Sequence, residues 1–92
     1  MRLILDGARL RYPSRVHRVL GRKLRFPAWY GRNLDALYDC LTDLHEDTEL
    51  ILVNWTAPGL QMLRRVMEDA ALENPHLTVT GEENFFTGSD RP

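Results

Sequence analysis

Two short apolar runs constrain the fold of this chain more than any other feature of its sequence. The first is LIL at residues 3–5, within MRLILDG (1–7), and the second is LILV at residues 50–53, within ELILVNW (49–55). The second run has too many consecutive apolar residues for a strand with one face in water, so it indicates a strand of a buried parallel sheet. Parallel strands require long crossover connections, which are usually helical. The segment between the two runs is therefore expected to contain helix.

The residues after position 13 have the apolar period of an amphipathic helix. Ser14 is its expected N-cap, and Pro27 closes the segment. One face of this helix is apolar and consists of Val16, Val19, Leu20 and Leu24. The opposite face is basic and consists of Arg15, Arg18, Arg22 and Lys23. The pattern predicts a helix whose apolar face packs on the core.

Two further helices and a third strand follow. Asn33 is a good N-cap for the second helix, and Pro58 suits the first turn of the third, which Asn74-Pro75 ends. The expected core stripe of the second helix is Leu34, Leu37, Leu41 and Leu44, and that of the third is Leu60, Leu63, Met67 and Ala70. The segment HLTVTG (76–81) is a weaker third strand.

This order of strand, helix, helix, strand, helix and strand predicts an α/β fold, with a small three-stranded parallel sheet packed against three to four helices. Right-handed crossovers place the helices on one side of the sheet when the strands follow one another in consecutive order. A length of 92 residues suits one domain. We expect it at residues 1–80, before a partly disordered C-terminal tail at 81–92 in which Phe85 and Phe86 could dock.

The remaining composition argues against several classes of protein. Cys40 is the only cysteine, so no internal disulfide can form, and we expect a buried, inert thiol. No apolar run is long enough for a membrane span or a signal peptide, so a cytoplasmic chain is expected. We also expect the chain to be monomeric when free. His17, His45 and His76 lack the spacing of metal ligands, and no nucleophile or phosphate-binding motif is present. We therefore expect neither a metal, a cofactor nor an enzyme.

A ladder of three aspartates marks the second predicted helix. Asp35, Asp39 and Asp43 recur every four residues, and no Lys or Arg occupies positions 33–63. Like charges at this spacing oppose helix formation by about 0.2–0.5 kcal/mol per pair. The helix dipole favours Asp35 in the first turn but not the other two. A solvated acidic face is the commonest explanation, but the adjacent aromatic loop Trp29-Tyr30-Gly31 also suits a binding interface.

The charges divide between the two parts of the chain. Residues 1–34 hold nine Arg or Lys and one acid, for a net charge of +8. Residues 35–92 hold three Arg or Lys and twelve acids, for a net charge of −9. Such polarity can mean a basic surface for nucleic acid, an acidic surface for a basic partner, or mutual neutralisation. A small nucleic-acid-binding or adaptor module that uses the basic face of the first helix is therefore an alternative function.

The segment YGRNLDALYDCLTD (30–43) resembles the signature of the barstar family, the intracellular inhibitors of barnase-type ribonucleases. The family pattern is roughly Y-G-x-N-L-D-A-L-x-D-C-L-T, and this chain matches it without a gap, with Tyr38 where tryptophan is common. The resemblance implies a barstar-like fold without catalytic activity. It also implies a one-to-one complex that blocks a ribonuclease active site, with Asp39 as the principal mimic of an RNA phosphate and Asp35 as the second.

The same resemblance implies further contacts with the partner. The loop aromatics would lie against the nuclease active site, Gly31 would permit close approach, and Asn33 would both cap the helix and touch the partner. The last helix would contribute an acid to the same cleft. The expected partner-binding residues beside the two aspartates are Trp29, Tyr30, Gly31, Asn33, Leu34, Tyr38, Thr42, Asp43, Asp69 and Glu73.

Overall fold

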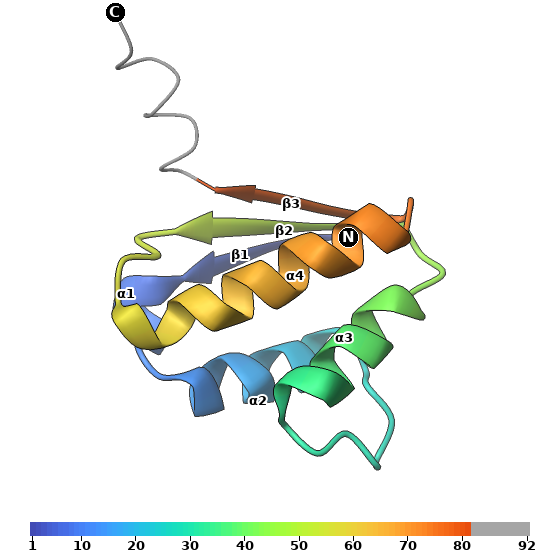
Figure 1. Cartoon of the computed structure of the whole chain (residues 1–92), viewed down its shortest axis with the longest axis horizontal. Helices are drawn as coiled ribbons and strands as arrows, with labels where there is room; N and C mark the ends of the chain where they lie inside the picture. Colours follow the sequence, from blue (N-terminus) through green and yellow to red (C-terminus); the bar gives the residue numbers. More distant parts are fainter. Residues whose placement is uncertain (82–92) are drawn as a thin grey trace, which may run out of the picture.

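The computed structural model of the chain describes residues 1–81, which form one three-stranded parallel sheet with helices packed against it (Figure 1). The strands are β1 (Arg2–Asp6), β2 (Thr48–Val53) and β3 (Leu77–Gly81), and they lie in the order β1-β2-β3. The predicted α/β fold with a three-stranded parallel sheet is thus confirmed. The prediction for Phe85 and Phe86 lies outside the described residues.

Four α-helices and one 3-10 helix connect the strands. They are α1 (Gly7–Leu10), α2 (Pro13–Lys23), α3 (Leu34–Thr42), η1 (Pro58–Leu60) and α4 (Gln61–Glu73). The helices α2, α3 and α4 lie on one side of the sheet (Figure 1), as right-handed crossovers between consecutive strands require. Within residues 1–81, no helix has the length and apolar character needed to cross a membrane.

One face of the sheet is buried and the other is open. Leu5, Leu50 and Leu52 point into the core, whereas Ile4 is 65% exposed on the opposite face. Ile51, the partner of Ile4 in the register of β1 and β2, is only half-buried. The expectation that β2 is buried on both faces is therefore wrong. Within residues 1–81, α2, α3 and α4 lie on one side of the sheet, so the side chains on the open face are shielded mainly by their neighbours in the sheet.

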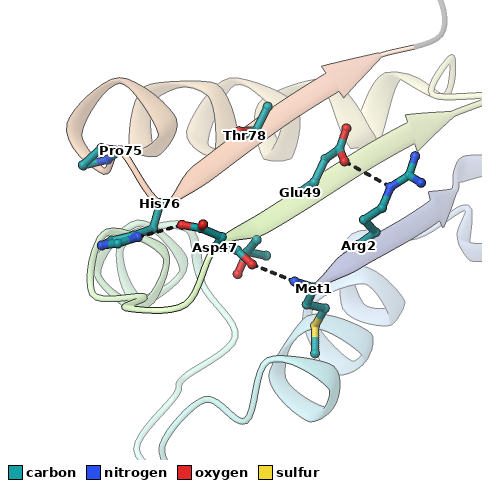
Figure 2. Close-up of a pocket in the computed structure, with 8 residues that line it drawn as sticks. Met1, Arg2, Asp47, Glu49, Pro75, His76 and Thr78 are labelled. Atoms are coloured by element: carbon teal, nitrogen blue, oxygen red, sulfur yellow. Dashed lines mark hydrogen bonds and ion pairs between the residues drawn. The ribbon is translucent and has the colours of Figure 1, made fainter.

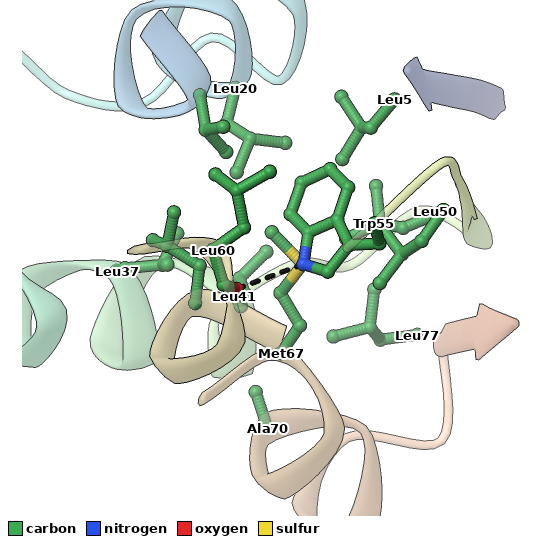
Figure 3. Packing of buried hydrophobic residues seen from close by; sticks show 13 residues of the cluster. Leu5, Leu20, Leu37, Leu41, Leu50, Trp55, Leu60, Met67, Ala70 and Leu77 are labelled. Carbon is green, nitrogen blue, oxygen red and sulfur yellow. Dashed lines mark hydrogen bonds between the residues drawn. The ribbon is translucent and has the colours of Figure 1, made fainter. Parts of the chain in front are cut away.

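The core fills the space between the sheet and the helices, with Trp55 near its centre (Figure 3). The indole of Trp55 is 2% exposed, and its Nε1 donates a hydrogen bond of 2.9 Å to the carbonyl of Leu60. This bond satisfies the polar end of a large apolar group, so the ring is buried without an unpaired donor. The buried cluster draws on every sheet strand and on α2, α3 and α4: Leu5, Val16, Leu20, Leu37, Leu41, Leu50, Leu52, Trp55, Leu60, Leu63, Met67, Ala70 and Leu77.

The helix starts differ from the sequence prediction at two places. The short α1 was not predicted; Asp6 caps it by accepting a hydrogen bond of 2.9 Å from the backbone N–H of Ala8. Ser14 is not the N-cap of α2, because Pro13 begins that helix and Tyr12 precedes it without a side-chain cap. Proline lacks the N–H that a first helical residue would leave unpaired, so it starts a helix at little cost.

The C-terminal end of α2 shows how the chain turns toward the next segment. The backbone N–H of Phe26 donates a hydrogen bond of 2.9 Å to the carbonyl of Gly21, across Arg25, which has a φ of 56°. This arrangement is a Schellman motif, in which the left-handed residue is usually glycine. The helix therefore ends at Lys23, before Pro27, and the loop that follows is folded back onto α2.

Asn74 joins the C-terminal ends of α4 and α3. It is the C-cap of α4, and its Nδ2 donates hydrogen bonds to the carbonyls of Leu41 and Leu44, at 2.9 and 3.0 Å. Its Oδ1 accepts a third bond, of 2.9 Å, from the backbone N–H of His76. The buried amide thus satisfies carbonyls that the end of a helix leaves unpaired, and it fixes α3 against α4.

Candidate functional site

The exposed face of α3 carries the aspartate ladder. Asn33 caps the helix, as predicted, because its Oδ1 accepts a hydrogen bond of 2.8 Å from the backbone N–H of Ala36. Asp35, Asp39 and Asp43 are all exposed. Successive members lie one helical turn apart, and within residues 1–81 none of the three forms an ion pair. The helix therefore offers a row of carboxylates that no described cation of its own chain neutralises.

The opposite face of α3 belongs to the core. Leu37, Cys40 and Leu41 are buried, whereas Leu34 and Tyr38 are half-buried and pack against the core cluster. Burial raises the pKa of the Cys40 thiol, and the negative charges of Asp39 and Asp43 raise it further. The thiol is accordingly protonated and unreactive at neutral pH, as expected. The core-facing residues hold the helix so that the aspartates face outward.

Thr42 has less freedom to bind a partner than its exposed neighbours. Its hydroxyl donates to the backbone carbonyls of Tyr38 and Asp39, in each case at 3.0 Å. A hydroxyl that is bonded to its own helix keeps only its lone pairs for a partner. Thr42 therefore lies on the edge of the acidic face as an acceptor rather than a donor.

The two loop aromatics have different environments. Trp29 is 62% exposed, whereas Tyr30 is half-buried. The ring of Tyr30 packs edge-on against Phe26 at a centroid separation of 4.8 Å, and its hydroxyl hydrogen-bonds to Nδ1 of His17 in α2. Only Trp29 is therefore presented as a large exposed anchor, while Tyr30 fastens the loop to α2.

Gly21 and His17 explain how α2 receives the Tyr30 ring. A Cβ at Gly21 would lie 3.4 Å from Cδ2 of Tyr30, so glycine leaves just enough room for close packing.

Burial of Tyr30 raises its pKa to about 12. Burial also lowers the pKa of His17, and the nearby charge of Arg32 lowers it further. The pair is thus neutral at pH 7. Sequence analysis missed this contact, because nothing in the local pattern links residues 17 and 30.

The turn into α3 depends on Gly31 and Arg32. A Cβ at Gly31 would lie 2.9 Å from Nδ2 of Asn33, so glycine keeps the capping side chain unobstructed. Arg32 has a φ of 57°, in the left-handed region that side chains other than Gly, Asn and Asp rarely adopt. The backbone bends at Arg32 and Asn33, immediately before the acidic helix, so Arg32 is a residue of the loop.

The predicted acids of α4 lie near the joint between the two helices. Asp69 and Glu73 are both exposed. Glu73 directly precedes Asn74, whose amide binds the carbonyls at the end of α3, so Glu73 lies beside that end. Asp69 lies one helical turn farther from the joint. A contribution of Asp69 or Glu73 to a surface shared with α3 stays a prediction.

A pocket of about 510 Å³ lies elsewhere, at the amino ends of the strands (Figure 2). Several of its polar groups are already paired: the amino group of Met1 donates to the carbonyl of Asp47 at 2.7 Å, and His76 contacts the carboxylate of Asp47 at 2.9 Å. None of the predicted partner-binding residues lines this pocket. Within residues 1–81, no group of three His, Cys, Asp or Glu side chains is arranged to hold a metal ion.

The family model described as "Barstar (barnase inhibitor)" matches residues 1–77, a segment that includes α3, α4 and the loop before α3. This chain belongs to the barstar family. The resemblance seen in residues 30–43 is thereby confirmed, and the family is one of inhibitors rather than enzymes.

A curated protein of Bacillus subtilis (strain 168), named "Putative ribonuclease inhibitor YrdF", is 51% identical to this barstar-family chain over 41 residues. The matched segment covers 45% of each protein, so the comparison spans less than half the length of either.

The ion pairs of this barstar-family protein bear on its divided charge. Arg2 pairs with Glu49 at 3.1 Å across the outer face of the sheet, and Arg64 pairs with Glu68 at 3.0 Å within α4. In the part of the chain that the structure describes, Arg18 and Arg22 of α2 form no ion pair. Direct pairing with the acids of residues 35–81 therefore does not neutralise these arginines.

Proposed function

We propose that this protein inhibits a barnase-type ribonuclease by binding it one-to-one and covering its active site with α3. Membership of the barstar family supports the class of partner. The observation that carries the mechanism is the pair of exposed carboxylates, Asp35 and Asp39, one turn apart on a capped helix and without an ion pair in residues 1–81. A ribonuclease cleft holds cationic side chains where RNA phosphates bind. The two carboxylates would occupy the positions of those phosphates.

Electrostatics favour such a complex more than they favour the free protein. Carboxylates one turn apart repel each other, by about 0.2–0.5 kcal/mol per pair. A cation-lined cleft would replace this repulsion by attraction in a desolvated site, where charge interactions are stronger than in water. The N-cap bond of Asn33 and the core contacts of Leu37 and Leu41 already hold the helix. The helix would therefore lose little conformational freedom on binding, and this small entropic cost favours a high affinity.

The remaining residues would surround this charged centre. Trp29 is the exposed aromatic beside α3, and large rigid side chains of this kind are common anchors of interfaces. Asp43 and Glu73 would lie toward the far edge of the contact, at the C-terminal ends of α3 and α4, with Asp69 one turn away. The other contacts that we propose come from the loop and from the sides of α3: Tyr30, Gly31, Asn33, Leu34, Tyr38 and Thr42.

Calorimetric titration into a panel of barnase-type ribonucleases tests this function. The protein should bind at least one of them with a stoichiometry of one, and Asp39→Ala should weaken that binding strongly. Loss of one partner of a buried charge pair costs about 2–5 kcal/mol, a range to which barnase–barstar complexes themselves contributed. The matched control is Glu46→Ala, which removes an exposed acid from the loop after α3. Equal effects of the two substitutions, or no binding by the unmodified protein, would contradict the proposal.

A second candidate function is binding of nucleic acid by the basic face of α2. The specific observation in its favour is Tyr12, which is exposed and has the guanidinium groups of Arg11 and Arg15 at 5.8 and 5.9 Å from its ring centre. Cations beside an exposed ring are typical of sites that stack bases. Arg15→Glu should then abolish binding of a single-stranded oligonucleotide and leave inhibition of a ribonuclease unchanged.

A further inference from the structure

A second pocket opens between α2 and the loop that precedes α3. Its volume is about 330 Å³. One wall is formed by Arg18 and Arg22, which lie one turn apart on α2, and the opposite wall includes Arg32 of the loop. His17 and Tyr30, which hydrogen-bond to each other, also line it. Because Tyr30 fastens the loop to α2, the two walls are held together without a partner.

The pocket is cationic, and the described residues that line it supply no counter-charge. Its lining holds three arginines and neither an aspartate nor a glutamate. Within residues 1–81, none of Arg18, Arg22 and Arg32 forms an ion pair. Arg32 lines the pocket together with His17 and Tyr30, and its positive charge lowers the pKa values of both. An anionic group that entered the pocket would therefore meet three guanidinium groups, which bind carboxylates with two parallel hydrogen bonds.

The position of the pocket links it to the proposed ribonuclease-binding surface. Arg32 directly precedes Asn33, the N-cap of α3, and Asp35 lies in the first turn of that helix. The exposed Trp29 lies between Ala28 and Tyr30, which both line the pocket. A globular protein seated on α3 and Trp29 would thus extend over the pocket as well. The complete ribonuclease-binding surface would therefore carry both negative and positive charge, with carboxylates on α3 and guanidinium groups beside them.

This division of charge favours a protein over RNA as the occupant. A nucleic-acid backbone is uniformly anionic, so a strand in the pocket would be repelled by the carboxylates of Asp35 and Asp39 on the adjoining helix. Of the rings that line the pocket, Phe26 and Tyr30 pack edge-on against each other, and His17 is buried and bonded to Tyr30. A folded partner can instead present cations to α3 and an acid to the pocket.

We propose that the pocket of Arg18, Arg22 and Arg32 receives an aspartate or glutamate from the rim of the ribonuclease bound to α3, and that it thereby selects among ribonucleases. This inference rests on the proposed inhibitory function. Cleft cations are common to enzymes that bind RNA phosphates, so α3 alone discriminates poorly among them. A ribonuclease would thus have to present two features to bind tightly: cations in its cleft for α3, and an acid on its rim for the pocket. A ribonuclease with a basic rim would be repelled by the same pocket.

Two double variants with equal loss of charge test the proposal. Arg18→Gln/Arg22→Gln removes two cations from the pocket, and Arg15→Gln/Lys23→Gln removes two exposed cations of the same helix that do not line it. Binding to the ribonuclease that the unmodified protein binds best should weaken roughly tenfold or more for the pocket variant, mainly through faster dissociation. The control variant should bind with almost unchanged affinity, because neither of its two cations lines the pocket. Circular dichroism would verify that both fold.

Arg32→Gln adds a test from the opposite wall, because it keeps a long side chain at the left-handed position and removes only the charge. Each aspartate and glutamate on the rim of the ribonuclease is then replaced by its amide. One of these changes should abolish the additional effect of Arg32→Gln, as expected for a directly paired acid. The absence of such an acid would overturn the inference.

The remaining outcomes separate the two proposals. If Asp39→Ala loses binding but the pocket variant behaves like its control, the inhibitory function stands and the inference is overturned. If Asp39→Ala loses nothing, or no ribonuclease binds, both fail. A fluorescein-labelled single-stranded RNA dodecamer serves as the final probe. If the unmodified protein binds it and the pocket variant does not, the pocket is a nucleic-acid site and the inference is again overturned.

Discussion

Asn74 permits a prediction whose size follows from the geometry of the joint between α3 and α4. The side chain is 3% exposed, and it makes three hydrogen bonds, with the carbonyls of Leu41 and Leu44 and with the backbone N–H of His76. Asn74→Ala removes all three. At about 0.5–1.5 kcal/mol net for each bond, the free energy of unfolding should fall by about 3 kcal/mol.

Urea denaturation followed by circular dichroism measures this loss. Small domains have a total stability of about 5–15 kcal/mol, so the expected loss is a large part of it. The melting temperature should fall by about 4–8 °C for each kcal/mol. The control is Asn33→Ala, which removes one exposed capping bond and should cost about 1 kcal/mol. If Asn74→Ala costs no more than Asn33→Ala, the assignment of Asn74 as the anchor between the helices is refuted.

Four further predictions concern the loop, the turns and the start of α1. Tyr30→Phe leaves Nδ1 of His17 without its partner and should lower the free energy of unfolding by about 1–3 kcal/mol in urea denaturation. The pKa of His17 is lowered in the folded protein, so the unfolded chain binds the proton more readily. The free energy of unfolding should therefore keep its full value above the unfolded pKa of about 6.5 and decrease as the pH falls below it. An NMR titration that gives His17 a pKa above 6.5 in the folded protein would contradict this. Arg25→Gly, at the left-handed residue after α2, should raise the free energy of unfolding by about 0.5–1 kcal/mol, whereas Lys23→Gly inside the helix should lower it by about 1 kcal/mol. Gly7→Ala drives a Cβ into the carbonyl oxygen of Asn54 and should lower the melting temperature strongly, at a cost of about 2 kcal/mol or more, whereas Gly59→Ala meets only ordinary contacts and should have little effect.

Sequence reasoning succeeded where a structural feature depends on neighbours along the chain. The N-cap role of Asn33 needs only the residues of the next helical turn, and the outward position of Asp39 follows from the apolar period of Leu37 and Leu41. The placement of the helices on one side of the sheet follows from right-handed crossovers, once the strands lie in consecutive order. These features are local or topological, so the pattern of residue types determines them.

It failed where the decisive partner is distant in sequence. Asn74 resembles any helix stop, and only folding brings its amide to carbonyls 30 and 33 positions earlier. The hydrogen bond between His17 and Tyr30 likewise joins two elements, and without it both loop aromatics were expected at the surface. The sequence did not distinguish Arg32 from the other basic residues of the chain. Its left-handed backbone and its place in the wall of the pocket depend on how the loop folds against α2.

The most direct test of the proposed mechanism is competition for the ribonuclease active site. A ribonuclease that binds this protein is titrated with it in the presence and absence of a 3′-mononucleotide, which occupies a phosphate position in the cleft. If the carboxylates of Asp35 and Asp39 take that position, the apparent Kd of the protein should rise roughly tenfold at a nucleotide concentration ten times the Kd of the nucleotide. Binding of the protein that saturating nucleotide leaves unchanged would contradict the mechanism.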